Sequence, residues 1–249
     1  MPRHDFRTPR LYVASPLAEG GEVALDRGQA NYLLNVLRCK HGDSVLLFNG
    51  RDGEWQARLA GAGKRAVTAQ VGARARPQPQ ACDLHFLFAP LKHARLDYLV
   101  QKAVEMGASR LQPVMTRHTQ VARVNLERMR ANVIEAAQQC GVLHLPEVVA
   151  PVAFDAAIAD NGRLLVFCDE RADVQDPVAA LRAAPAGLPL SVLIGPEGGF
   201  AEDERAALGR RPQVARIALG PRILRADTAA VAALALVQAV LGDWREPLD

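Results

Sequence analysis

The chain has 249 residues and nearly balanced charge, with 30 Lys and Arg against 27 Asp and Glu and a formal net charge of +3. Its apolar fraction of 49% is that of an ordinary globular protein with one large domain or two small ones. The N-terminal residues lack the apolar core of a signal peptide, and the longest apolar run, 229–240, is too short to span a bilayer. We therefore expect a cytoplasmic protein with no membrane partner.

Four cysteines, Cys39, Cys82, Cys140 and Cys168, are scattered along the chain. They form no Cys-x-x-Cys spacing, and no pair of histidines lies near any of them in the sequence. Structural zinc sites and disulfide frameworks need such patterns. The sequence therefore predicts reduced thiols and no metal site.

Residues 1–74 have the pattern of a small β-barrel with a basic surface. Strands are predicted at 11–13, 44–49, 54–59 and 66–71, with one helix at 29–38. Residues 1–76 carry 12 Lys and Arg against 7 Asp and Glu, so the positive charge is concentrated here. A basic small domain beside a nearly neutral larger part predicts that the small domain binds a polyanion such as RNA.

A polar segment interrupted by prolines, 74–80, separates this barrel from a second domain, expected over residues 75–249. Strands are predicted there at 85–90, 110–115, 147–150, 164–168 and 191–194, and helices at 96–106, 125–140, 177–184, 202–208 and 228–241. The alternation of strands and helices predicts an α/β fold with a mostly parallel sheet and helices on both faces.

Two glycine-containing loops stand out in this second domain. One is Gly195-Pro196-Glu197-Gly198-Gly199, and the other begins at Leu219-Gly220-Pro221. Each follows a short apolar strand and precedes a helix, which is the position of ligand-binding loops at the carboxyl ends of parallel strands. Because glycine lets the backbone approach a ligand closely, we expect the two loops to form one pocket.

The sequence argues against a phosphate-containing ligand in this pocket. No G-x-G-x-x-G motif follows a strand, and no Lys-Ser/Thr pair closes the first loop into a Walker motif. Glu197 and the acidic run 202–204 would repel a phosphate at the following helix. A nucleoside with a positive centre, such as S-adenosylmethionine, suits these loops better.

The second loop adds two arginines, Arg222 and Arg225, ahead of Asp227-Thr228, which is a strong N-cap signal for the last helix. An arginine three residues before a cap can point into the same crevice as the loop. There it could hold an RNA phosphate or an anionic base through charge-assisted hydrogen bonds.

The two loops, 193–199 and 219–229 with its Gly-Pro-Arg-Ile-Leu-Arg run, together resemble the RsmE family. This family consists of 16S ribosomal RNA uridine-N3 methyltransferases of the SPOUT superfamily. The resemblance extends to Arg10-Leu-Tyr-Val13, to the helix with Gln101-Lys102 and Gly107, and to 135–147. The family pattern is broken at Val142, where it usually has arginine, and at Asp227, where it usually has glutamate.

The resemblance implies a PUA-like barrel followed by a SPOUT domain with a C-terminal trefoil knot, a homodimer packed through the knot, and S-adenosylmethionine in the knot crevice. By this resemblance Arg225 is the catalytic candidate. The implied cofactor-binding residues are Leu193, Gly195, Pro196, Glu197, Gly198, Gly199, Leu219, Gly220, Ile223, Leu224 and Thr228.

The implied partner is 16S ribosomal RNA within the small ribosomal subunit. The basic residues that we expect to contact this RNA are Arg10, Arg38, Lys40, Lys92 and Arg222. Uridine N3 carries a proton and lies on the Watson–Crick edge, so the target base must be unpaired before its methylation. Arg225 suits stabilisation of the uracil anion, whereas Glu197, Asp227, a histidine or water could each accept the proton.

Other functions remain open at this point. A ribosome-assembly factor could bind RNA without cofactor, and a doubly wound enzyme could act on a small nucleotide. Within the superfamily, 2′-O-ribose and guanine-N1 methylation are the nearest alternatives.

Overall fold

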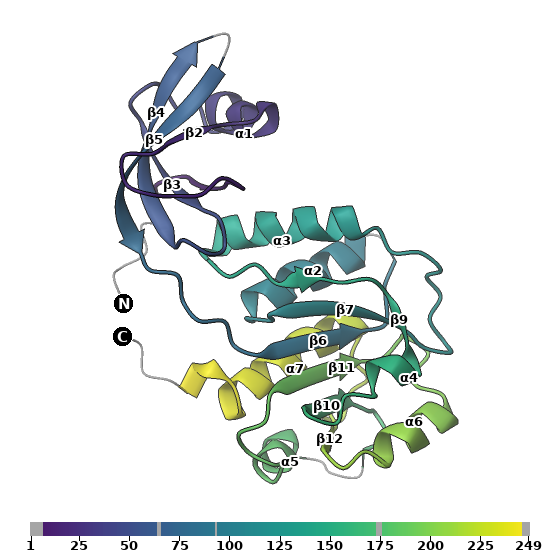
Figure 1. Ribbon diagram of the computed structural model, residues 1–249. Helices are drawn as coiled ribbons and strands as arrows, with labels where there is room; N and C mark the ends of the chain where they lie inside the picture. Colours follow the sequence, from purple (N-terminus) through teal and green to yellow (C-terminus); the bar gives the residue numbers. More distant parts are fainter. Residues whose placement is uncertain (1–6, 64–65, 93, 173–175, 246–249) are drawn as a thin grey trace. The chain divides into compact units, whose positions relative to one another are not determined.

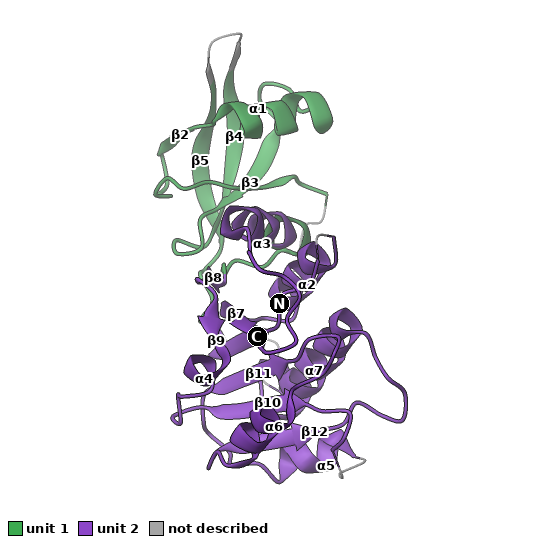
Figure 2. Cartoon of the chain, turned by 90° about the vertical axis from the view of Figure 1, so that its right-hand side faces the viewer, with its two compact units in different colours: residues 1–80, 137–145 green, residues 81–136, 146–249 purple. Residues whose placement is uncertain are grey.

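A computed structural model describes residues 7–63, 66–92, 94–172 and 176–245 of the chain. The chain divides into two compact units (Figure 2). Unit 1 contains residues 1–80 and 137–145, and unit 2 contains residues 81–136 and 146–249. A helix of unit 2, α3 (Leu126–Cys140), therefore contributes its last residues to unit 1.

Unit 1 is built on a curled five-stranded sheet with the order β1-β3-β4-β5-β2 (Figure 1). Its strands are β1 (Arg10–Tyr12), β2 (Glu22–Ala24), β3 (Ser44–Phe48), β4 (Glu54–Gly63) and β5 (Ala66–Arg76). β1 runs parallel to β3, and the other pairs are antiparallel. Alternating apolar side chains such as Val45, Leu47 and Ala57 fill its core, as the period of a strand requires.

A short helix covers this sheet. α1 (Arg27–Asn31) begins at Asp26, whose carboxylate accepts from the backbone N–H of Gln29 at 2.8 Å in a capping box. It continues as a π-helix, Tyr32–Val36, in which Leu33 is fully buried. Arg38 follows with φ 58°, a left-handed conformation that few non-glycine residues adopt. The predicted helix over 29–38 is thus present with an irregular second half.

An arginine–glutamate cluster closes unit 1. Arg10 Nε donates to Glu54 at 2.5 Å and Arg76 Nε donates to the same carboxylate at 2.7 Å. Arg76 also donates to the carbonyl of Gly141 at 3.0 Å, which fastens the 137–145 segment to the sheet. Arg10, which was predicted to contact RNA, has a side chain that is only 5% exposed and is paired with Glu54.

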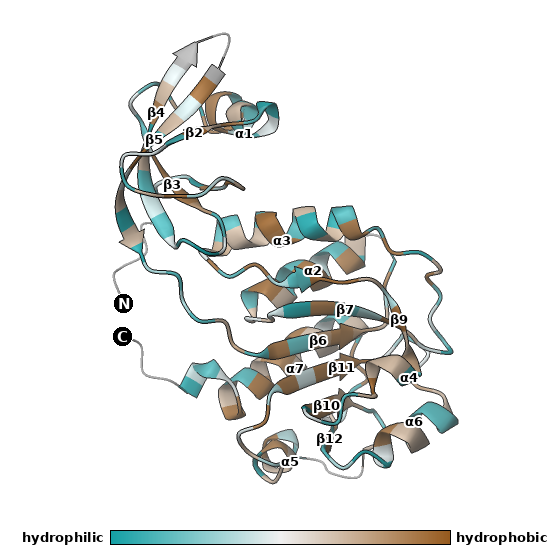
Figure 3. Cartoon of the chain, viewed as in Figure 1, coloured by the Kyte–Doolittle hydropathy of each residue, from teal (hydrophilic) through white to brown (hydrophobic). Residues whose placement is uncertain are grey.

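Unit 2 is an α/β sandwich around a parallel sheet with the order β12-β10-β11-β6-β7-β8. Its strands are β6 (Leu84–Phe88), β7 (Arg110–Met115), β8 (Glu147–Val148), β9 (Val152–Ala153), β10 (Leu164–Cys168), β11 (Leu190–Ile194) and β12 (Val214–Ile217), with β9 paired to β7. The α/β class and the parallel sheet predicted from the sequence are confirmed. The central strands β10 and β11 are hydrophobic because both of their faces are covered (Figure 3).

Helices lie on the two faces of this sheet (Figure 1). They are α2 (Ala94–Glu105), α3, α4 (Phe154–Ala157), α5 (Pro177–Arg182), α6 (Glu202–Gly209) and α7 (Ala226–Val240), followed by a short 3₁₀ turn, Asp243–Arg245. On one face Phe154 of α4 and Leu208 of α6 pack with Leu87 and Leu193. α7 contacts β11, α2 and α5. No helix among the described residues is long and apolar enough to cross a membrane.

Candidate functional site

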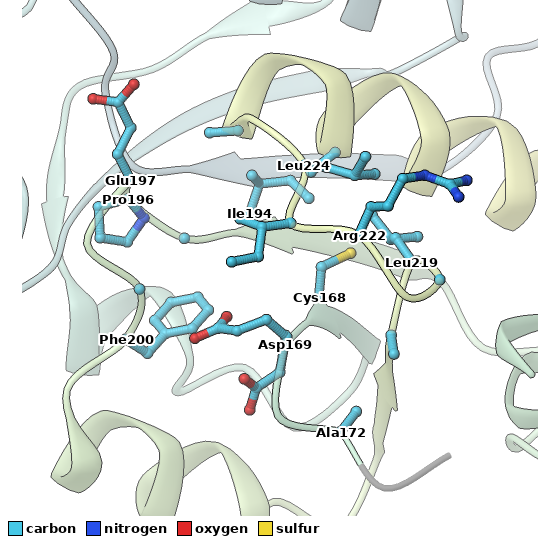
Figure 4. A pocket seen from close by; sticks show the side chains of 18 of the residues that line it. Cys168, Asp169, Ala172, Ile194, Pro196, Glu197, Phe200, Leu219, Arg222 and Leu224 are labelled. Carbon is cyan, nitrogen blue, oxygen red and sulfur yellow. The ribbon is translucent and has the colours of Figure 1, made fainter. Parts of the chain in front are cut away.

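The loops that follow β10, β11 and β12 meet at the carboxyl edge of the sheet and enclose a cavity of about 600 Å³ (Figure 4). This volume lies within the range of small-molecule sites in proteins. The three strands are neighbours in the parallel sheet, so their carboxyl ends reach the same edge. The lining residues are Cys168, Asp169, Glu170, Ala172, 194–200, 218–224, Ala226 and Ala229.

The first loop, 195–200, is a tight turn that needs its glycines. The N–H of Gly199 donates to the carbonyl of Pro196 at 2.9 Å, and Gly199 has φ 70°. A Cβ on Gly195 would lie 2.9 Å from the ring of Phe200, which is buried against Phe154 and Phe167. The loop therefore packs on an aromatic cluster through Phe200, and its residues line the cavity.

The second loop, 218–225, leads into α7. Gly220 has φ 89°, and α7 begins at Ala226 with Arg225 as its N-cap residue. The predicted Asp227-Thr228 cap is wrong: Asp227 lies in the first helical turn, and its Oδ1 accepts from the N–H of Thr228 at 2.9 Å. A carboxylate in the first turn still complements the helix dipole.

One arginine links these two loops. Arg95, near the start of α2, donates from Nε to Asp227 Oδ2 at 2.9 Å and from Nη1 to Glu197 Oε1. The hydrogen bond from Arg95 holds the pKa of Asp227 below its ordinary value. No sequence pattern marks Arg95, because its partners Glu197 and Asp227 lie 102 and 132 residues away along the chain.

The third wall of the cavity, after β10, was also missed. Asp169 is fully buried, and its carboxylate accepts from Arg205 Nε at 3.2 Å and from Arg216 Nε at 3.0 Å. Arg205 also donates to Glu170 at 2.6 Å and to the carbonyl of Phe200 at 2.6 Å, so it joins the first and third walls. The predicted strand 164–168 could have indicated this wall, because parallel strands end at the same edge of a sheet and the glycine loops lie at that edge.

The acidic start of α6 is largely paired. Glu204 accepts from the backbone N–H groups of Ala201 and Arg117, each at 2.8 Å. Arg117 pairs with Asp203 at 2.5 Å, and Arg171 lies 3.5 Å from Glu202. The charge of these carboxylates is thus compensated locally. Glu170 and Glu197 line the cavity with side chains that are each 51% exposed, and they pair with Arg205 and Arg95 respectively.

Most of the predicted cofactor-binding residues come together. The lining includes Gly195, Pro196, Glu197, Gly198, Gly199, Leu219, Gly220, Ile223 and Leu224. Leu193 does not line the cavity, because it is fully buried in the sheet core, and Thr228 lies exposed on α7. Arg222, predicted to contact RNA, lines the cavity on the side opposite Glu197 (Figure 4).

Arg225, the catalytic candidate, lies exposed beside the cavity and does not line it. Its guanidinium makes no hydrogen bond or ion pair with another described residue. Lys92, just before α2, and Arg38 and Lys40 of unit 1 are likewise exposed. These four cations are free to meet an anionic partner.

The cavity suits a cationic nucleoside better than covalent or metal chemistry. Desolvation and the neighbouring Asp169 raise the pKa of Cys168 to about 12, so this thiol is a poor nucleophile. No group of metal-ligating side chains occurs in the described parts of the chain. Backbone polar groups of the glycine loops, apolar Leu219 and Leu224, and the carboxylates of Glu170 and Glu197 fit the adenosine, the sulfonium and the amino group of S-adenosylmethionine.

Comparison with known proteins gives the class first. A family model described as an RNA methyltransferase domain matches residues 78–238, and a model described as an RNA methyltransferase PUA domain matches residues 25–72. The chain is 30% identical to ribosomal RNA small subunit methyltransferase E of Rickettsia conorii over 240 residues, which is 96% of this chain and 98% of that protein. The chain belongs to the small subunit methyltransferase E family, and the resemblance carried by the two loops is confirmed.

Other relatives agree. Ribosomal RNA small subunit methyltransferase E of Synechocystis is 31% identical over 243 residues, covering 93% of this chain and 78% of that protein. The structure of the Neisseria gonorrhoeae enzyme of this name, bound to S-adenosyl methionine, has a TM-score of 0.82 and 26% identity over 94% of this chain and 98% of that one. A Legionella pneumophila methyltransferase with bound SAM has a TM-score of 0.84 and 26% identity, covering 95% and 99%.

Proposed function

We propose that this protein uses S-adenosylmethionine to methylate N3 of a specific uridine in 16S ribosomal RNA. The observation that carries the proposal is the cavity that the two glycine loops form, together with the segment after β10, at the carboxyl edge of the sheet. Relatives named small subunit methyltransferase E support the RNA substrate, and a relative of that name bound to S-adenosyl methionine supports the cofactor.

The cofactor would be held by the residues of both loops that line the cavity. Backbone groups of 195–199 and 219–224 would bind the adenosine, and Glu170 and Glu197 would favour its positive charge. When bound, S-adenosylmethionine supplies an electrophilic methyl group on a good leaving group. The protein then has to align the nucleophile and stabilise its charge.

Arg225 is the residue that we assign to the substrate. Its exposed guanidinium has no partner among the described residues and lies one residue before α7, next to Ala226 of the cavity wall. A forked cation there can hold the oxygens of a uracil whose N3 has lost its proton, and so stabilise the anion that attacks the methyl group.

Replacing Arg225 tests this role. Arg225→Ala should lower kcat for methyl transfer to small ribosomal subunits by about a hundredfold, as loss of one charge-stabilising group does elsewhere. Calorimetric affinity for S-adenosylmethionine should stay within about twofold, because Arg225 does not line the cavity. Arg210→Ala, an exposed arginine after α6, is the matched control. Full activity of Arg225→Ala would remove this residue from the mechanism.

The same measurements separate this proposal from its rival, an RNA-binding assembly factor without catalysis. Such a factor would bind small subunits and would give no calorimetric signal with S-adenosylmethionine. A cavity built from intact glycine turns favours the enzyme.

We assign RNA guidance to the barrel of residues 1–74 and methyl transfer to residues 75–249. Arg38 and Lys40 are exposed on unit 1, and so is an aromatic side chain, Tyr32, at the start of the preceding π-helix. Phosphates attract such cations, and aromatic rings stack on unpaired bases. Arg222 and Lys92 extend the set of RNA contacts to unit 2.

Charge reversal tests the barrel. The double variant Arg38→Glu/Lys40→Glu should weaken binding to small subunits by about tenfold or more at low salt and flatten the salt dependence of the affinity. Binding of S-adenosylmethionine should not change. Arg182→Glu, which changes an exposed arginine at the end of α5, is the control. Equal RNA affinity of the double variant and the control would exclude the barrel surface as the guide.

The finer architecture follows from the resemblance. We propose that residues 218–240 complete a trefoil knot. Its support is that α7 leaves β12 at the edge of the sheet and packs against β11, α2 and α5. We further propose a homodimer packed through this region, acting in the cytoplasm on RNA of the small ribosomal subunit. Light scattering of the purified protein measures the dimer directly.

A further inference from the structure

The two glycine loops of the cavity have no direct polar connection. Among the described residues, no hydrogen bond or ion pair joins the segment 195–200 to the segment 218–229. In the second segment Arg222 and Arg225 form no ion pair with another described residue, whereas Asp227 pairs with Arg95. A cavity built from two such walls needs something that fixes their separation.

Arg95 is placed to do this. α2 follows β6, the neighbour of β11 in the sheet, and the N–H of Ala89 donates to the carbonyl of Ile194 at 3.0 Å. The start of α2 is thereby held beside the point at which the first loop begins. From there the guanidinium reaches Glu197 in one loop and Asp227 behind the other (2.9 Å from Nε).

Helix stability does not explain an arginine at this position. Arg95 is the second residue of α2, and a cation in the first turn opposes the positive end of the helix dipole. The arginine also carries a buried Nη2 that has no hydrogen-bond partner among the described residues, which is a further cost. The contacts to Glu197 and Asp227 are what its placement provides.

We propose that Arg95 is a positioning residue that clamps the two walls of the cofactor cavity together through Glu197 and Asp227. A planar guanidinium can bind two carboxylates in fixed directions, which a lysine cannot do. The guanidinium of Arg95 is one positive charge against two carboxylates, so this group of three side chains carries one net negative charge. This inference rests on the proposed function and adds the residue that holds its site in shape.

The clamp also bears on the choice of general base. Glu197 and Asp227 both bind the guanidinium of Arg95, and that contact restricts their motion and holds the pKa of Asp227 below its ordinary value. Substituting Glu197 or Asp227 should therefore mainly lower the affinity for S-adenosylmethionine. A residue that removes the uridine proton would instead act mainly on kcat.

The test is calorimetric and kinetic, on the full chain. Arg95→Met should weaken binding of S-adenosylmethionine by about tenfold, and Arg95→Lys should recover part of this loss. The KM for S-adenosylmethionine should rise more than kcat falls. Glu197→Gln removes one arm of the clamp at a half-exposed site, so it should fold even if Arg95→Met does not. In the double variant Glu197→Gln/Asp227→Asn, the further substitution Arg95→Met should change the affinity for S-adenosylmethionine very little.

Arg128→Met is the matched control, because Arg128 binds Asp97 of the same helix α2 and does not line the cavity. Its affinity for S-adenosylmethionine should match that of the wild type. The clamp is overturned if Arg95→Met binds S-adenosylmethionine like the control, or if its effect is undiminished in the double carboxylate background. If the wild type itself gives no binding, the proposed function fails instead.

Discussion

At the scale of residues, arginine is the main structural partner of the buried carboxylates in this chain. Glu54 is held by Arg10 and Arg76, and Asp169 by Arg205 and Arg216. A buried carboxylate needs such compensation, and the arginine fork provides it with defined geometry. Unpaired arginines beside the cavity are therefore informative. Arg222 and Arg225 lack described partners, and this marks them for an external anion.

Sequence alone could not make this distinction. Arg10 and Arg38 both lie in the basic first domain, and the composition of that domain does not distinguish one from the other. Only the fold brings Glu54, 44 residues away, against Arg10 and buries both side chains, while Arg38 stays exposed. Charge patterns predict that a surface binds a polyanion, but long-range pairing decides which cations remain free.

The pKa of Glu54 leads to a prediction on acid stability. Burial alone would raise this pKa, but the hydrogen bonds from Arg76 and Arg10 bring it below its ordinary value. A lowered folded-state pKa stabilises the fold above the unfolded value of about 4.3, and this stabilisation is lost as the pH falls through the folded value. Glu54→Gln should lower the free energy of unfolding by about 3 kcal/mol at pH 7. Because the variant has no carboxylate to protonate at this position, its free energy of unfolding should fall less than that of the wild type between pH 7 and pH 3.

Urea unfolding at pH 7 and at pH 3 measures both effects. Glu127→Gln, which breaks the exposed pair with Arg130, is the control and should change the free energy of unfolding by less than about 1 kcal/mol. A Glu54→Gln variant as stable as this control at pH 7 would contradict a stabilising role of the cluster.

At the scale of elements, glycine spacing was the strongest guide to the site. The two loops between a strand and a helix were predicted from sequence, and they line one cavity. The wall after β10 was missed because it has no glycine or proline to mark it. The start of α7 was misplaced because Asp227-Thr228 has good capping chemistry, yet the chain turns into the helix at Arg225. In the structure Asp227 lies in the first turn and pairs with Arg95.

The first loop gives a prediction of its own. A Cβ at Gly195 would lie 2.9 Å from the Phe200 ring, so Gly195→Ala should displace either the loop or the ring. We expect affinity for S-adenosylmethionine to fall by about tenfold or more, since the backbone of this loop faces the cavity. Gly209→Ala at the end of α6 has open space around the added methyl group and is the control. Unchanged calorimetric affinity in Gly195→Ala would show that the loop does not shape the site.

At the scale of the whole molecule, the order of the strands was beyond pattern analysis. Alternating strands and helices predict a parallel sheet, but the order β12-β10-β11-β6-β7-β8 depends on contacts between distant segments. The same holds for residues 137–145, which follow the linker in sequence but belong to unit 1. Removing residues 1–74 would delete Arg10 and Glu54. It would keep Arg76, the partner of the Gly141 carbonyl, but without the sheet to which Arg76 belongs. Point variants are the safer test of the barrel.

The central claim is that this chain methylates N3 of a uridine in 16S ribosomal RNA, and nucleoside mass spectrometry tests it most directly. Small ribosomal subunits from a strain lacking the protein are incubated with the purified chain and S-adenosylmethionine, and their RNA is digested to nucleosides. We predict that 3-methyluridine appears in 16S ribosomal RNA with the wild-type chain and is strongly reduced with Arg225→Ala. A 2′-O-methylated nucleoside, 1-methylguanosine or no new methylated nucleoside would contradict the account.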